Sequence, residues 1–340
     1  MLHRRLISAA CLVGVAVLLI VLDLRSPVAG QAGIWLIPLF LAFTLGTVWE
    51  ACQLLARKIA IQPRYVLVHA SFGCAVSLFP IWYSWTLQAT YPIDCPVGRT
   101  GWVLIGILSG VGSAGIQAIL QLRQSSLSAA MASAPTTAVA GKFPEQQNPE
   151  PHGPDMYDKF VRSEFERTTL AWVVSSFVLA YVVGCMSFWL LVRLHGSSLQ
   201  GILNLVSLLA IVKFADAGAY FVGKSIGKRK LIPLISPGKT VEGLFGGLVA
   251  SIAVSYLFLR VLLPWCGGQV GTWWFGPALL GCLLTLIGLV GDLLESMVKR
   301  MVGAKDSGTM LPGLGGVWDV TDSLLPTAIV GYLGIIAKLT

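Results

Sequence analysis

Long apolar runs alternate with short polar segments along almost the whole chain. Each run is long enough to cross the hydrocarbon core of a bilayer as an α-helix, which takes about 20 residues. We place nine such runs, near residues 6–24, 33–54, 65–83, 101–122, 169–192, 199–221, 243–263, 274–296 and 322–339. The pattern predicts an all-α, polytopic integral membrane protein with about nine transmembrane helices.

One segment breaks this alternation. Residues 123–155 are rich in Ser, Ala and Pro and lack apolar periodicity, which is typical of disorder. Residues 156–168 mix charges with aromatic side chains and predict a short amphipathic helix on the membrane surface. The chain thus divides into an N-terminal four-helix region (1–122), a largely disordered insertion (123–168) and a C-terminal five-helix region (169–340).

The composition is that of a membrane protein, and the distribution of charge predicts its orientation in the membrane. Hydrophobic residues make up 55% of the chain, and the formal net charge is +8. With the N-terminus in the cytoplasm, 18 of the 24 Lys and Arg residues fall on the inside, four fall outside and two lie within spans. This split follows the positive-inside rule. Topology in a cell membrane therefore explains the positive charge, and nucleic acid is not needed to account for it.

Acidic residues concentrate in one stretch, residues 291–326. It holds five of the sixteen acidic residues of the chain: Asp292, Glu295, Asp306, Asp319 and Asp322. The side chains of residues 292, 295, 296 and 299 share one face of a helix, because they are spaced at i, i+3, i+4 and i+7. Asp319 and Asp322 share a face of the next helix in the same way. A polar loop needs no such periodicity, so the stretch predicts a functional site at a membrane surface.

A second informative stretch covers residues 213–247. Lys213 and Asp216 stand three apart in an apolar span, where an ionisable residue is by default a functional candidate. A simple helix ion pair is the alternative. A short loop then brings five cations together with glycines and hydroxyls, a combination that suits polyphosphate. Plain positive-inside topology is the alternative explanation for that loop.

Four carboxylates, those of Asp216, Asp292, Asp319 and Asp322, fall at about one membrane depth in this layout. Neighbouring carboxylates about 4 Å apart would repel by roughly 4 kcal/mol at an effective dielectric near 20. A divalent cation removes that repulsion, and oxygen ligands without His or Cys favour Mg²⁺ or Mn²⁺. The residues alone predict a metal-dependent transferase that uses a nucleoside triphosphate and a membrane-borne acceptor.

Two motifs carry a family resemblance. Ser296-x-x-Lys299-Arg300-x4-Lys305-Asp306-x-Gly308, followed by Pro312-Gly313-x-Gly315-Gly316-x-x-Asp319-x-x-Asp322, resembles the signature of the phosphatidate cytidylyltransferases. The stretch from Asp216 through AYFVGK to ISPGKTVEG is similar to the second conserved region of that family. Together the motifs cover about the C-terminal third of the chain.

The resemblance implies that CTP and phosphatidate give CDP-diacylglycerol and pyrophosphate, with Mg²⁺ or Mn²⁺ as cofactor and residues 169–340 as the catalytic region. The implied metal ligands are Asp319 and Asp322, supported by Asp292 and Asp216. The implied catalytic residues are Lys299, Lys305 and Asp306. The implied substrate-binding residues are Lys224, Ser236, Lys239, Thr240, Ser296, Arg300, Gly313, Gly315 and Gly316. The expected partners are CTP, phosphatidate and membrane lipid, and a homodimer is a possible assembly.

Two positions depart from the family pattern. The family usually has His where this chain has Leu314, and Arg where it has Val320. Phosphate contacts at these positions must be weaker here or come from elsewhere. Three other functions remain open: a CTP-dependent polyprenol or dolichol kinase, a membrane transporter that couples through Lys213 and Asp216, and a scaffold without catalysis.

Overall fold

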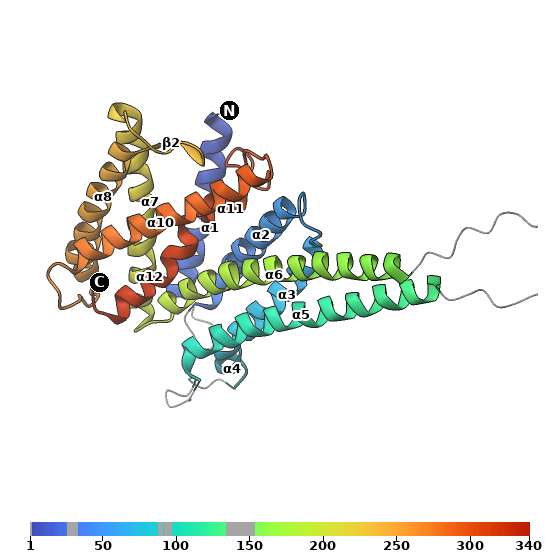
Figure 1. Cartoon of the computed structure of the whole chain (residues 1–340). Coiled ribbons are helices and arrows are strands. Elements are labelled where there is room, and N and C mark those ends of the chain that lie inside the picture. Colours follow the sequence, from blue (N-terminus) through green and yellow to red (C-terminus); the bar gives the residue numbers. More distant parts are fainter. Residues whose placement is uncertain (1, 26–32, 88–90, 92–96, 134–153) are drawn as a thin grey trace, which may run out of the picture.

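A computed structural model of the chain describes residues 2–25, 33–87, 91, 97–133 and 154–340. The helices among these residues are α1 (Leu2–Arg25), η1 (Ile34–Leu36), α2 (Ile37–Leu55), α3 (Pro63–Ser77), α4 (Phe79–Leu87), α5 (Gly98–Ser133), α6 (Pro154–Arg193), α7 (Ser198–Ile226), α8 (Val241–Tyr256), the π-helical η2 (Leu257–Leu262), α9 (Leu263–Trp265), α10 (Gly276–Met301), α11 (Val317–Thr321) and α12 (Leu324–Ile336). Two short strands, β1 (Lys230–Ile232) and β2 (Ser236–Thr240), form an antiparallel pair. Figure 1 shows the resulting helical bundle.

The predicted all-α membrane architecture is confirmed. Eight helical segments in the described part of the chain are long and apolar enough to cross a bilayer. Helices α3 and α4, bent by 54° where they meet, make a ninth if they are taken as one span. Many large apolar side chains on these helices are exposed, as lipid-facing positions require.

The structure differs from the prediction for residues 123–168 at both ends of that segment. Helix α5 continues to Ser133, and α6 begins at Pro154 and runs without a break to Arg193. The predicted short surface helix is therefore the first part of a 40-residue helix, about 60 Å long and about twice the thickness of the hydrocarbon core. In Figure 1, α5 and α6 lie side by side and extend beyond the rest of the bundle. Packing between two helices stabilises a sequence that is weakly periodic on its own. Residues 134–153 lie outside the described residues.

The apolar core is continuous between the N-terminal and C-terminal regions. One cluster of buried side chains includes members of α2, α3, α6, α7, α10 and α12. The Trp189 indole on α6 also donates a hydrogen bond to the Leu324 carbonyl, at 3.0 Å. Helix α6 thus joins the two halves of the bundle, so the residues at one end of α10 are held by elements from both.

Close packing of α7 against α8 places the β1–β2 hairpin. A Cβ atom at Gly218 would lie 2.9 Å from the Gly246 carbonyl, and one at Gly243 would lie 2.7 Å from the Ala219 carbonyl. Small residues allow this approach of two backbones, as is common in membrane helices. The Glu242 carboxylate accepts hydrogen bonds from two backbone amides before β1. The hairpin is thereby held across the end of the bundle (Figure 1).

Candidate active site

Helix α10 presents the predicted row of polar side chains on one face. Lys299 Nζ lies 2.8 Å from Glu295 Oε2, one turn earlier. Ser296 Oγ lies 3.5 Å from Asp292 Oδ1, also one turn earlier. These distances follow from the i, i+4 spacing of the pairs. The face is therefore a local property of the sequence that the fold preserves.

Three carboxyl groups meet beside this face. Ligand oxygens of Asp292, Glu295 and Asp322 all lie within 4.8 Å of one another. Glu295 is only 1% exposed, and its Oε1 atom is buried without a hydrogen-bond partner in the described structure. Asp322 reaches the group from the junction of α11 and α12. We call these three residues the carboxylate cluster. An orphaned buried oxygen and mutual repulsion make it a fitting site for a divalent cation.

Asp319 lies beside this cluster and has its own partners. Its Oδ1 atom lies 2.9 Å from Lys299 Nζ. Its Oδ2 atom accepts hydrogen bonds from the backbone N–H groups of Gly316, at 2.8 Å, and Ser307, at 3.2 Å. The sequence placed Asp319 and Asp322 on one helix face, and the backbone stays helical through Asp322, whose N–H donates to the Trp318 carbonyl. Their carboxylates nevertheless contact different partners, and Lys299 connects Asp319 to the carboxylate cluster through Glu295.

Asp216 and Lys213 reach the same region from α7. The Lys213 ammonium donates to the Val320 carbonyl, at 3.1 Å, and to Ser323 Oγ, at 3.2 Å. Ser323 in turn donates to Asp216 Oδ2, at 3.0 Å. Lys213 and Asp216 also face each other at 3.6 Å, as a simple helix pair would. Their contacts with the α11–α12 junction make them more than a local pair and place a cation beside position 320.

Of the basic loop, Lys239 contacts the carboxylate cluster directly. Its ammonium lies 2.5 Å from Asp292 Oδ2. Thr240 is buried and caps α8 by accepting the Gly243 N–H, and Ser236 begins β2 opposite Ile232. Lys224 is exposed, with its ammonium 5.6 Å from the centre of the Tyr220 ring. The hairpin thus brings one predicted cation of this loop to α10.

The glycine-rich loop before α11 borders the site. Gly313 and Gly315 have positive φ angles, 81° and 98°, which side chains rarely adopt. A Cβ atom at Gly315 would also lie 2.8 Å from Asp319 Oδ2. Lys305 and Asp306 are exposed on the same loop. Arg300 Nε lies 3.4 Å from the Ile235 carbonyl, which joins the end of α10 to the hairpin.

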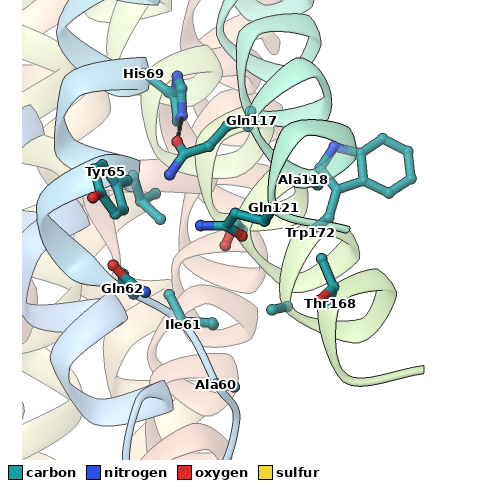
Figure 2. Close-up of a pocket in the computed structure, with 14 residues that line it drawn as sticks. Ala60, Ile61, Gln62, Tyr65, His69, Gln117, Ala118, Gln121, Thr168 and Trp172 are labelled. Carbon is teal, nitrogen blue, oxygen red and sulfur yellow. Dashed lines mark hydrogen bonds between the residues drawn. The ribbon is translucent and has the colours of Figure 1, made fainter. Parts of the chain in front are cut away.

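A separate cavity of about 60 Å³ lies between α3, α5 and α6, away from the carboxylate cluster. Figure 2 shows its lining, in which the His69 ring lies 2.5 Å from the Gln117 amide oxygen. The other ring nitrogen lies 2.9 Å from Ser113 Oγ. Its lining has amides, hydroxyls and aromatic rings but no carboxylate, Lys or Arg. The chemistry predicted from the sequence therefore belongs to the carboxylate cluster, not to this cavity.

Sequence reasoning missed two residues of the site. Glu295 was not among the predicted metal ligands, although its place between Asp292 and Lys299 on the helix face was a usable signal. Glu50, on α2, contacts the glycine loop through its carboxyl group. Nothing in the local sequence indicated that contact, because 257 residues separate Glu50 from Ser307.

The fold and the site together define a polytopic helical membrane protein with carboxylates, lysines and glycine backbone gathered at one end of its bundle. The model of the cytidylyltransferase family matches residues 3–336. The chain belongs to this family.

Curated relatives match a smaller part of the chain. Phosphatidate cytidylyltransferase of Brucella suis biovar 1 (strain 1330) is 41% identical over 140 residues, 41% of this chain and 49% of the relative. Phosphatidate cytidylyltransferase of Bacillus subtilis (strain 168) is 38% identical over 152 residues, 45% of this chain and 54% of the relative. Uncharacterized protein YnbB of Escherichia coli (strain K12) is 38% identical over 161 residues, 47% of this chain and 50% of the relative. The matches thus span about half the length of these relatives.

Proposed function

We propose that the protein transfers the cytidylyl group of CTP to phosphatidate and so forms CDP-diacylglycerol. An oxygen of the lipid phosphate bonds to the α-phosphorus of CTP, the bond from that phosphorus to the β-phosphate bridge breaks, and pyrophosphate leaves. The observation that carries this proposal is the carboxylate cluster with Lys239 and Lys299 in direct contact with its members. Family membership and the names of two relatives agree with it.

Asp292, Glu295 and Asp322 would hold Mg²⁺ or Mn²⁺. Their fit rests on the oxygen-only donor set and on the unpartnered buried Oε1 atom of Glu295. When bound, such an ion would polarise phosphate oxygens and neutralise charge on the triphosphate. Asp319 and Asp216, predicted as ligands from the sequence, stand beside this set and hold Lys299 and Ser323 in place.

The cations of the site stabilise negative charge on the substrates. Lys299 is held between two carboxylates, so its ammonium has a defined position before any substrate binds. Lys239, on the hairpin, contacts Asp292, and Lys213, on α7, contacts the α11–α12 junction. Arg300 contacts the hairpin at the Ile235 carbonyl, and Lys305 is exposed on the glycine loop, so both add positive charge around the site. The absence of side chains at Gly313 and Gly315 suits close approach of a phosphate to the loop.

The site faces the cytoplasm in this proposal, and the N-terminus lies on the same side. Inward-facing cations and the bacterial source of the relatives support the inner membrane as its location. Phosphatidate then enters from the inner leaflet and CTP from solution. A homodimer is compatible with this arrangement and is not required by it.

The test is an assay of purified protein in detergent with labelled CTP and phosphatidate. We expect labelled CDP-diacylglycerol and one pyrophosphate per product. A polyprenol or dolichol kinase would instead release CDP from a membrane alcohol. If CTP is consumed only with the alcohol, or is not consumed at all, the proposal is wrong.

A further inference from the structure

Glu50 is a buried acidic residue that contacts the site from the opposite half of the chain. It lies on α2 and is 1% exposed. Its Oε2 atom accepts hydrogen bonds from the Trp318 N–H, at 2.9 Å, and from Ser307 Oγ, at 3.2 Å. A carboxyl group in a membrane-spanning helix is costly to bury, so its presence with two specific donors indicates a function.

The glycine loop packs directly on this carboxyl group. A Cβ atom at Gly308 would overlap Glu50 Oε1, and one at Gly316 would overlap Glu50 Oε2. A side chain at either position would therefore push the loop away from α2. The two glycines and the buried carboxyl group form one packed unit, in which each defines where the other lies.

Ser307 extends this unit to Asp319. Its hydroxyl donates to Glu50 and accepts the Asp319 N–H, at 3.2 Å. Its own backbone N–H donates to Asp319 Oδ2, at 3.2 Å. Asp319 in turn lies 2.9 Å from Lys299 Nζ. A continuous series of hydrogen bonds thus runs from α2 through the loop to the lysine of α10.

We propose that Glu50 is a positioning residue for the active site. It acts through Ser307 and the glycine loop to hold the Asp319 carboxylate against Lys299, and it does not touch the substrates. Asp319 lies in the first turn of α11, directly after the loop, and its Oδ2 atom accepts hydrogen bonds from the backbone N–H groups of Ser307 and Gly316. The orientation of Asp319 therefore depends on the loop, and that of the loop on Glu50. The expected change in kcat rests on the proposed cytidylyl transfer.

The test compares Glu50→Gln and Glu50→Ala with a matched control. Gln keeps one acceptor oxygen for Ser307 and Trp318, but it places an NH₂ group where the buried Oε1 atom, which has no hydrogen-bond partner among the described residues, packs against Gly308. Ala leaves both donors unpaired. The control is Thr44→Val, because Thr44 is also buried on α2 and its hydroxyl bonds only to Phe40 of the same helix among the described residues. Three quantities are measured: kcat and KM for CTP, the unfolding temperature in detergent, and hydrogen exchange of peptides covering residues 303–318.

We expect Glu50→Ala to lower kcat about 100-fold, as small misplacements of reacting groups do. Glu50→Gln should lower it about tenfold, with KM for CTP within about threefold of wild type. Both should speed exchange in residues 303–318 but not in α8, and Thr44→Val should change neither quantity. If Glu50→Ala does not fold, Glu50→Gln alone decides.

Two results would overturn the proposal. One is a kcat for Glu50→Gln within twofold of the Thr44→Val value. The other is lost turnover with unchanged exchange in residues 303–318, which would separate Glu50 from the loop. If the wild type itself makes no CDP-diacylglycerol, the proposed function fails, and unchanged loop exchange in Glu50→Gln would then refute the structural link by itself.

Discussion

The Lys239 ammonium lies 2.5 Å from Asp292 Oδ2 and so joins the β1–β2 hairpin to the carboxylate cluster on α10. Both side chains are partly buried, at 22% and 34% exposure, where an ion pair is screened less than at an open surface. The contact places one cation of a five-cation loop beside the carboxylates. Lys239 therefore compensates part of their charge, and in the proposed function it contacts a phosphate once substrates bind.

Replacing Lys239 by Met should lower turnover about 100-fold, because a positioned charge that stabilises the transition state is lost. Lys230→Met is the matched control: Lys230 is exposed on β1 of the same hairpin, and it should stay within about twofold of wild type. CDP-diacylglycerol formation at saturating CTP measures both. Equal rates for the two variants would show that the Lys239–Asp292 pair only fastens the hairpin.

Removing one charge from the carboxylate cluster should abolish metal-dependent turnover. Asp322→Asn and Glu295→Gln keep size but each loses an anionic oxygen ligand, so we expect a loss of about 100-fold or more. Asp319→Asn should also abolish turnover, since Lys299 loses one of the two carboxylates that hold it in position. The wild type should require Mg²⁺ or Mn²⁺ and lose activity in excess chelator. Glu166→Gln, in an exposed pair with Arg162 on α6, is the control. Full activity in chelator would contradict the proposed metal site.

Lys213 should supply the positive charge that Val320 does not. Its ammonium lies 3.1 Å from the Val320 carbonyl. We expect Lys213→Met to lower turnover about tenfold. Adding Val320→Arg to that variant should restore part of the rate, because the new guanidinium would lie on the helical segment whose backbone Lys213 contacts. The measurement is kcat for the single and double variants. If Val320→Arg lowers activity equally in the wild-type and Lys213→Met backgrounds, the two positions do not share a role.

The protein should be active with its own Leu314 and Val320, without substitution of either residue by the His or Arg that the family usually has.

The orientation in the membrane can be tested with single cysteines. The exposed Cys266, in the segment before α10, should react only from the outside. A Ser126→Cys variant near the end of α5, in a background without other cysteines, should react only from the cytoplasm. Labelling of intact cells and of inverted vesicles with an impermeant maleimide separates the two sides. Cytoplasmic labelling of Cys266 would place the site on the other face of the membrane and contradict the predicted orientation.

Local pattern was sufficient for the membrane architecture and for the polar face of α10. An apolar run of about 20 residues has few stable alternatives to a spanning helix, because its backbone must satisfy its own hydrogen bonds in lipid. Side chains at i, i+3, i+4 and i+7 share a face whatever the rest of the chain does. Asp292, Glu295, Ser296 and Lys299 therefore lie together as their spacing predicts.

Contacts between segments far apart in the chain were decided by the tertiary structure. Only packing could bring Glu50 to Ser307, Lys239 to Asp292, or Lys213 to Val320, since no periodicity connects these pairs. Asp319 and Asp322 have helical spacing, yet their carboxylates contact different partners. The continuation of α5 and α6 beyond their predicted spans likewise involves packing of the two helices against each other. The sequence by itself determined the spans and the chemical groups of the site. The packing of the helices determined which of those groups meet, because small residues and buried hydrogen bonds allow one close arrangement.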